Sequence, residues 1–150
     1  MFRPGPAFDR GGELPQNRRE GVTAVANILC VDDDHDIIAL KRAILEKAGH
    51  TVVSCNSVED AVRELTRQSY DAVVTDWRLG EESGREIIQA AQANSNVPVV
   101  VVSGYVAEAF QAAEPLADIY LEKPVDSREL IQILNTLLQA RSEGSQKSRA

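Results

Sequence analysis

The chain alternates between short apolar segments and longer segments in which apolar residues recur every three or four positions. The short segments are rich in valine and isoleucine, which favour buried strands. One of them is apolar from Val97 to Val102, which is typical of a strand covered on both faces. The pattern predicts five strands, at residues 27–31, 51–55, 72–75, 97–103 and 119–122.

The segments between and after these strands have the spacing of amphipathic helices. Gly49 is placed to end the first helix. Ser57 with Asp60, and Asp126 with Glu129, have the spacing of capping boxes at the starts of the second and fifth helices. The pattern predicts helices at about residues 36–47, 57–68, 84–93, 106–113 and 126–139.

Five strands that alternate with five helices predict a single α/β domain, which we assign to residues 27–140. The expected architecture is a doubly wound five-stranded parallel sheet with right-handed crossovers and helices on both faces. Residues 1–26 hold three of the six prolines and four glycines without a sustained period, so we expect a flexible N-terminal tail. Residues 141–150 show no apolar period, and we expect a disordered C-terminal tail.

Composition narrows the class of protein. The 150 residues carry a net charge of −7, which argues against a basic surface for nucleic acid. No apolar run is long enough to cross a membrane, and the N-terminus lacks the apolar core of a signal peptide, so we expect a cytoplasmic protein. Cys30 and Cys55 lie in predicted strands and are expected to be buried, unpaired thiols. We expect His35 and His50 at the surface near helix ends.

Chemically active residues follow several of the predicted strands. Asp32–Asp34 follow the first strand, Asp76 follows the third, Ser103 ends the fourth, and Lys123 comes just after the fifth. The carboxyl ends of parallel strands lie along one edge of a sheet, where α/β proteins bind ligands. Carboxylates this close together repel one another unless a cation compensates them. Hard oxygen donors without cysteine predict Mg²⁺ rather than zinc.

Asp76 taken alone is compatible with a helix cap, a metal ligand or a nucleophile. Its predicted neighbours favour the last two roles. Acids, a metal, the Ser103 hydroxyl group and the Lys123 ammonium group together suit an oxygen-rich anion, most simply a phosphoryl group. A carboxylate can itself accept a phosphoryl group as an aspartyl phosphate, and the protein then mainly supplies positioning and charge neutralisation.

Four motifs in this order resemble the receiver domain of two-component response regulators. They are V-D-D-D at 31–34, V-V-T-D-W-R-L at 73–79 with a glycine eight residues after the aspartate, V-V-S-G at 101–104, and Y-L-E-K-P at 120–124. The resemblance covers about residues 27–140. It implies a flavodoxin-like fold with strand order 2-1-3-4-5, and a signalling switch rather than an enzyme.

The resemblance also implies a metal site and a phosphoacceptor. Asp76 would accept a phosphoryl group from a phosphohistidine of a partner histidine kinase or histidine phosphotransfer protein. The Mg²⁺ ligands would be Asp32, Asp33, Asp76 and the backbone carbonyl group of Arg78. Ser103 would bind a phosphoryl oxygen.

Further residues are assigned by the same resemblance. Lys123 would pair with the phosphate, and the Lys123–Pro124 peptide bond would be cis. Tyr120 matches the switch aromatic, which moves inward when Ser103 shifts toward the phosphate. Two positions are unusual. Gly80 stands where the family often has proline, which should loosen the loop, and Arg78 lies where a side chain influences how long the phosphate survives.

Two alternatives remain open at this point. Asp32 and Asp34 also fit a D-x-D motif, which resembles phosphatases of the haloacid dehalogenase type, with Asp32 as nucleophile and Asp34 as acid/base. The other alternative is a receiver-like interaction module that is never phosphorylated.

For the preferred assignment, we expect no output domain after residue 140 and therefore a stand-alone switch, monomeric or weakly dimeric. Its output would be contact with a downstream protein or onward phosphotransfer to another histidine.

Overall fold

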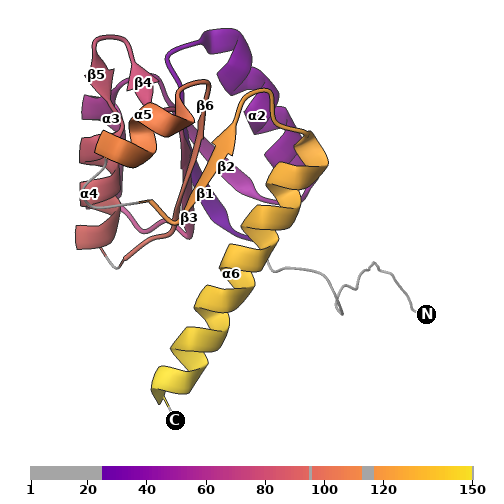
Figure 1. Ribbon diagram of the computed structural model, residues 1–150. Coiled ribbons are helices and arrows are strands. Elements are labelled where there is room, and N and C mark those ends of the chain that lie inside the picture. Colours follow the sequence, from indigo (N-terminus) through magenta and orange to yellow (C-terminus); the bar gives the residue numbers. More distant parts are fainter. Residues whose placement is uncertain (1–24, 95, 113–116, 150) are drawn as a thin grey trace.

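The computed structural model describes residues 25–94, 96–112 and 117–149 (Figure 1). The predicted N-terminal tail lies almost entirely outside the described residues. The strands are β1 (Asn27–Val31), β2 (Thr51–Cys55), β3 (Ala72–Thr75), β6 (Val99–Ser103) and β7 (Ile119–Glu122). They form one parallel sheet in the order β2-β1-β3-β6-β7. This confirms the predicted fold class and strand order.

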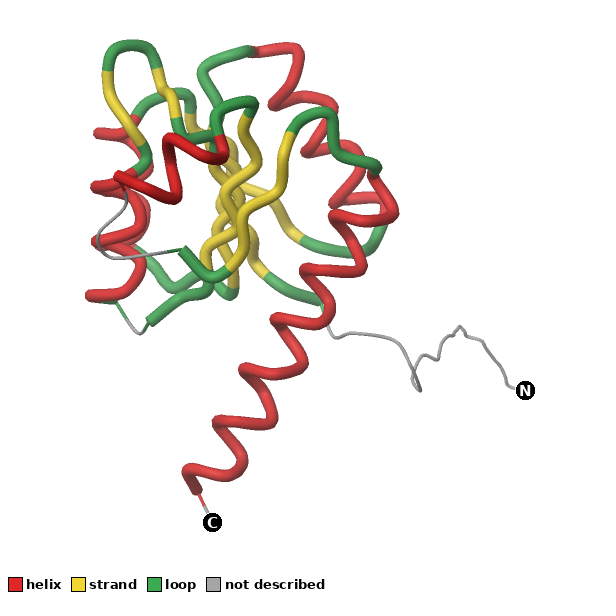
Figure 2. The backbone as a smooth tube through the Cα atoms, in the orientation of Figure 1, coloured by secondary structure: helices red, strands yellow, loops and turns green. Residues whose placement is uncertain are grey.

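Helices cover both faces of this sheet, and Figure 2 shows the strands running between two helical layers. Side chains alternate across each strand, so Leu29 and Val31 face one apolar cluster while Ile28 and Cys30 face the other. Helices α3 (Val58–Arg67), α4 (Arg85–Ala93) and α5 (Val106–Ala112) contribute to the first cluster. Helices α2 (His35–Lys47) and α6 (Ser127–Arg149) contribute to the second.

The predicted caps locate the helix ends. Asp34 caps α2 by accepting the backbone N–H groups of residues 36 and 37, and Gly49 follows its C-terminus with φ of 101°. The Ser57 hydroxyl group accepts the N–H group of Asp60 and begins α3. Among the described residues, no helix is long and apolar enough to cross a membrane.

The sequence-based description is wrong at three places. Helix α6 continues to Arg149, although we expected it to end near residue 139 and residues 141–150 to be disordered. Figure 1 shows its last turns extending beyond the sheet. The lack of an apolar period indicates only that these turns carry no apolar stripe in the sequence. A helix already nucleated by packed turns adds further residues without incurring the cost of nucleation again.

The other two differences are local. Strands β4 (Arg78–Leu79) and β5 (Glu82–Ser83) form a small antiparallel hairpin that is too short to produce a periodic pattern. His50 was expected at the surface but is only 6% exposed, and its Nδ1 accepts the backbone N–H group of Ala26. Its partner lies 24 positions away in the sequence, so local spacing does not reveal it.

Candidate functional site

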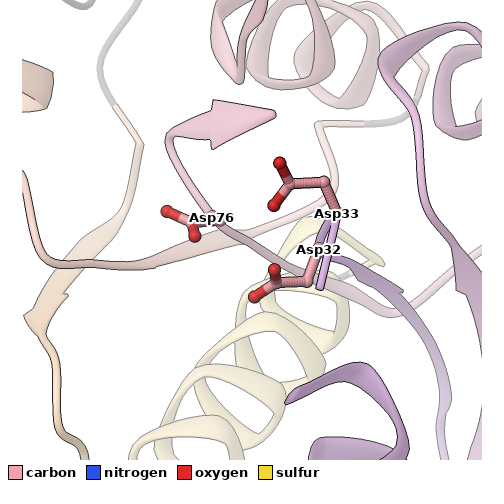
Figure 3. A group of neighbouring side chains, drawn as sticks. All are labelled: Asp32, Asp33 and Asp76. Atoms are coloured by element: carbon pink, nitrogen blue, oxygen red, sulfur yellow. The ribbon is translucent and has the colours of Figure 1, made fainter. Parts of the chain in front are cut away.

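Parallel pairing brings the acidic residues together. Val31 and Thr75 are register partners in β1 and β3, and Asp32 and Asp76 come directly after them. One carboxylate oxygen from each of Asp32, Asp33 and Asp76 lies within 4.8 Å of the other two (Figure 3). Asp32 and Asp76 are buried, whereas Asp33 is exposed. The edge predicted to bind a ligand therefore holds a compact group of three carboxylates.

Asp76 is fixed by its backbone and by two donors. Its N–H group donates to the carbonyl oxygen of Val31 at 3.1 Å, so the residue still belongs to the sheet edge. Its Oδ1 accepts the backbone N–H group of Trp77 at 2.6 Å, and its Oδ2 accepts Lys123 Nζ at 2.8 Å. Gly84 packs closely behind it, because an added Cβ would lie 3.0 Å from the Asp76 carbonyl oxygen.

Lys123 links the two buried acids. Its ammonium group also lies 3.4 Å from Oδ2 of Asp32, and its side chain is 31% exposed. Burial opposes its charge, but hydrogen bonding and attraction from Asp76 and Asp32 outweigh burial and raise the pKa of Lys123. The next peptide bond, Lys123–Pro124, is cis, as the resemblance implied.

A second lysine, Lys41, was missed by the sequence analysis. It lies on α2, and its Nζ is 3.3 Å from Oδ2 of Asp32. The side chain is only 6% exposed. A signal was available, because Ile38, Lys41 and Leu45 have the spacing of one helix face, and all three are buried. A lysine within an apolar stripe indicates an internal anionic partner.

Ser103 and Tyr120 lie near this edge but do not contact the acids. Ser103 is fully buried at the end of β6, and its Oγ accepts the backbone N–H group of Tyr105 at 3.0 Å. Tyr120 is half-buried on β7, where its hydroxyl oxygen accepts the N–H group of Ala117. The Tyr120 ring meets Phe110 edge to face, with 5.6 Å between the centroids.

Glu108 joins the segment after Asp76 to helix α5. Its Oε1 accepts Arg78 Nη2 at 2.6 Å, and its Oε2 accepts the indole N–H group of Trp77 at 3.2 Å. The hydrogen bond from Arg78 lowers the pKa of the Glu108 carboxyl group. The Arg78 guanidinium group also stacks over the Tyr105 ring at 3.7 Å. Sequence spacing did not identify this contact, which connects residues 30 positions apart.

Gly80, in the turn between β4 and β5, contacts the third acid of the site. It has φ of 66°, and its N–H group donates to Oδ2 of Asp33 at 2.9 Å. Proline could not make this bond, because it has no N–H group. The glycine that we expected to loosen the loop thus supplies a contact to one of the three acids.

The donor set fits Mg²⁺. All three side-chain donors are carboxylates, and Mg²⁺ prefers oxygen ligands.

The thiols of Cys30 and Cys55 are free and buried within the core, as predicted. Burial raises the pKa of each thiol to about 11, so both are protonated at neutral pH.

Comparison with known proteins identifies the family. A sequence model of the response regulator receiver domain matches residues 28–135. The chain belongs to this family. Over 117 residues the receiver domain is 31% identical to the transcriptional regulatory protein GlrR of Escherichia coli (strain K12). That match covers 76% of this chain and 26% of GlrR, so the chain spans about a quarter of that relative's length.

Solved receiver domains have the same fold. A receiver domain from Clostridium thermocellum matches with a TM-score of 0.71 and 27% identity, covering 79% of this chain and 98% of that one. The receiver domain of the sensor histidine kinase PA1611 from Pseudomonas aeruginosa PAO1 matches with a TM-score of 0.70 and 27% identity, covering 77% and 99%. That structure has a magnesium ion coordinated in its active site cleft.

These matches confirm the predicted resemblance to response regulators, whose receiver domain is a signalling switch rather than a classical enzyme. The phosphatase alternative is less compatible with the site. Asp34, its proposed acid/base, caps α2 through hydrogen bonds to the N–H groups of Asp36 and Ile37. It is not a member of the group formed by the other three carboxylates.

Proposed function

We propose that this receiver domain is a phosphoacceptor switch in which Asp76 takes a phosphoryl group from a phosphohistidine of a partner histidine kinase or histidine phosphotransfer protein. The observation that carries this proposal is the position of Asp76. It is buried beside two other carboxylates, and Lys123 Nζ lies 2.8 Å from its Oδ2. This arrangement combines a nucleophile with a cation that can pair with the incoming phosphate.

The transfer is a displacement at phosphorus. A carboxylate oxygen of Asp76 forms a bond to phosphorus while the phosphorus–nitrogen bond of the phosphohistidine breaks. The imidazole nitrogen keeps the electron pair and takes up a proton from solvent. The hydrogen bond from the Trp77 N–H group orients the carboxylate throughout. Most of the catalytic effect is positioning and charge neutralisation.

Mg²⁺ would be held by Asp32, Asp33, Asp76 and the backbone carbonyl group of Arg78. When bound, it neutralises the negative charge that gathers on the phosphoryl oxygens. The magnesium ion in the cleft of the related PA1611 receiver domain supports this assignment. Lys123 neutralises the same charge from the β7 side of the site.

Phosphorylation changes the surface through two side chains. The Ser103 hydroxyl group leaves the N–H group of Tyr105 and donates to a phosphoryl oxygen. Tyr120 then leaves its hydrogen bond with Ala117 and turns inward. These movements alter the surface formed by α5, β7 and the start of α6, which a downstream protein recognises.

The proposal is tested by intact mass after incubation with Mg²⁺ and a small-molecule acyl phosphate. Wild type is expected to gain one phosphoryl group, and Asp76→Asn none. Asp60→Asn, which removes a carboxylate on α3 away from the site, is the matched control and should behave as wild type. If wild type gains nothing, the alternative of a module that is never phosphorylated is favoured. Undiminished phosphorylation of Asp76→Asn would instead favour Asp32 as nucleophile.

A further inference from the structure

Among the described residues, Lys41 is the most deeply buried charged side chain that the proposed mechanism leaves without a role. It stands in the apolar stripe of α2, and its Nζ approaches Oδ2 of Asp32 at 3.3 Å. Asp32 itself is 1% exposed. A buried carboxylate is costly unless it is paired, and Lys41 supplies a partner from inside the domain.

Two lysines share the same oxygen of Asp32 but differ in their surroundings. The Lys41 side chain is 6% exposed, and its ammonium group contacts Asp32. The Lys123 side chain is 31% exposed, lies 3.4 Å from Asp32, and makes its shorter contact with Asp76. Lys41 is therefore held in place by the core, whereas Lys123 is the lysine free to follow a phosphoryl group.

The orientation of Asp32 depends on this pair. Its Oδ1 accepts the backbone N–H group of Asp34 at 3.0 Å, and its Oδ2 faces Lys41. Both oxygens are thus restrained before any metal binds. Lys41 also places a fixed positive charge next to a carboxylate that would coordinate a divalent cation. A buried charge of this kind is poorly screened by solvent or salt.

We infer that Lys41 is a positioning residue that acts as the permanent counter-ion of Asp32 and lowers the affinity of the acidic site for Mg²⁺. This inference rests on the proposed function, because it assumes that the three carboxylates hold the metal. Lys41 keeps Asp32 compensated when Lys123 moves toward the phosphoryl group. In exchange, the site binds Mg²⁺ more weakly than three carboxylates and one lysine would.

The sign of the effect separates this role from a purely structural one. If Lys41 only supported the fold, its loss would misplace Asp32 and weaken Mg²⁺ binding. If it acts as a fixed repelling charge, its neutralisation strengthens binding, even though the metal-free domain becomes less stable. The measurement is a titration of Trp77 fluorescence with Mg²⁺. Trp77 is the only tryptophan, and its backbone N–H group donates to Asp76 Oδ1.

Lys41→Met keeps the length of the side chain and removes its charge. We expect its half-saturating Mg²⁺ concentration to fall by about tenfold, and Mg²⁺ to raise its melting temperature more than that of wild type. Lys47→Met is the matched control, because Lys47 is exposed in the last turn of the same helix. It should keep the wild-type Mg²⁺ response. Lys41→Arg keeps the charge and should also stay near the wild-type value.

Unchanged or weaker Mg²⁺ binding by Lys41→Met, with a normal response in wild type, overturns the inference and leaves the proposed function intact. If Lys41→Met does not fold without metal, Lys41→Gln provides the same comparison, because it removes the charge but can still hydrogen-bond to Asp32. A wild-type domain that does not respond to Mg²⁺ in fluorescence or melting would overturn both the metal site and the role of Lys41.

Discussion

Aspartate residues occupy both ends of the sheet, but their partners differ. At the amino ends of the strands, Asp71 Oδ2 accepts the backbone N–H group of Asn27 at 2.8 Å, and Asp118 Oδ2 accepts that of Val99 at 2.8 Å. Each carboxylate therefore satisfies the first N–H group of a neighbouring strand. At the carboxyl ends, Asp32 and Asp76 face the ammonium groups of lysines.

This difference distinguishes the end of the sheet at which we propose that phosphoryl transfer takes place. Asp71 and Asp118 each accept a strand N–H group, and among the described residues neither belongs to the group of neighbouring carboxylates, which fits a structural role. Three carboxylates with two lysines leave one negative charge uncompensated in a partly buried site. That excess favours an added cation, and the lysines favour an added anion. The four predictions below test whether the two ends separate in this way, from the largest effect to the smallest.

The largest effect is expected from Asp32→Asn. It leaves Lys41 buried without a charged partner, which should lower the free energy of unfolding by about 3 kcal/mol. It also removes a proposed Mg²⁺ ligand, so the Trp77 fluorescence response to Mg²⁺ should be lost. Asp118→Asn is the matched variant at the other end. It should keep the full Mg²⁺ response, and urea unfolding measures the stability of both.

Gly84→Ala should disturb the carboxyl end through packing alone. Its added Cβ would lie 3.0 Å from the backbone oxygen of Asp76, so the loop has to move. We expect a loss of about 1–2 kcal/mol in urea unfolding and slower phosphorylation by the acyl phosphate. Gly104→Ala is the control for stability, because a Cβ there has no neighbouring atom within 4 Å. Equal losses in the two variants would contradict the close packing at Asp76.

Asp71→Ala should affect stability but not chemistry. It removes the acceptor for the Asn27 N–H group, and the expected cost is about 1 kcal/mol. Asp71→Asn keeps an acceptor oxygen and should lose less. Both variants should be phosphorylated as wild type in the mass assay. A defect in phosphorylation would show that the amino end of the sheet also contributes to the site.

The smallest effect concerns His50, which lies at the amino end before β2. Burial lowers its pKa, against opposing effects of a hydrogen bond with Asn135 and the charge of Asp71. At a pH below about 6.5, His50 therefore binds a proton more readily in the unfolded chain than in the folded domain. The free energy of unfolding consequently decreases as the pH falls through this range. The melting temperature of wild type should decrease as the pH is lowered, and that of His50→Gln should decrease less steeply. Replacing the exposed His35 by glutamine should leave the slope unchanged.

Local sequence patterns predicted most of the strands and helices of the fold. Buried strands, amphipathic helices and caps such as Asp34 and Ser57 depend on neighbouring residues, so spacing alone predicted them. The order of motifs at the strand ends also predicted that four residues lie at one edge of the sheet, because the carboxyl ends of parallel strands meet there. These residues are Asp32, Asp33, Asp76 and Lys123. The placement of these residues was thus predictable, although their distances were not.

Contacts between distant segments were not predictable in the same way. The pairing of Lys41 with Asp32, the bond from Ala26 to His50 and the contacts of Glu108 all depend on how separate elements pack. A lysine on an apolar helix face was the only local sign of any of them. The predicted end of helix α6 was wrong for another reason. Apolar periodicity predicts the part of a helix that packs on the core, and it does not report where the helix ends, which is Arg149.

The most direct test of the central claim locates the phosphoryl group itself. Wild-type protein is treated with Mg²⁺ and the acyl phosphate donor, reduced with borohydride, and digested for peptide mass mapping. Borohydride reduces an aspartyl phosphate to homoserine, which marks the acceptor permanently. We predict homoserine at Asp76 and unmodified aspartate at positions 32, 33 and 34. Homoserine at Asp32, with Asp76 unmodified, would contradict the assignment of the phosphoacceptor.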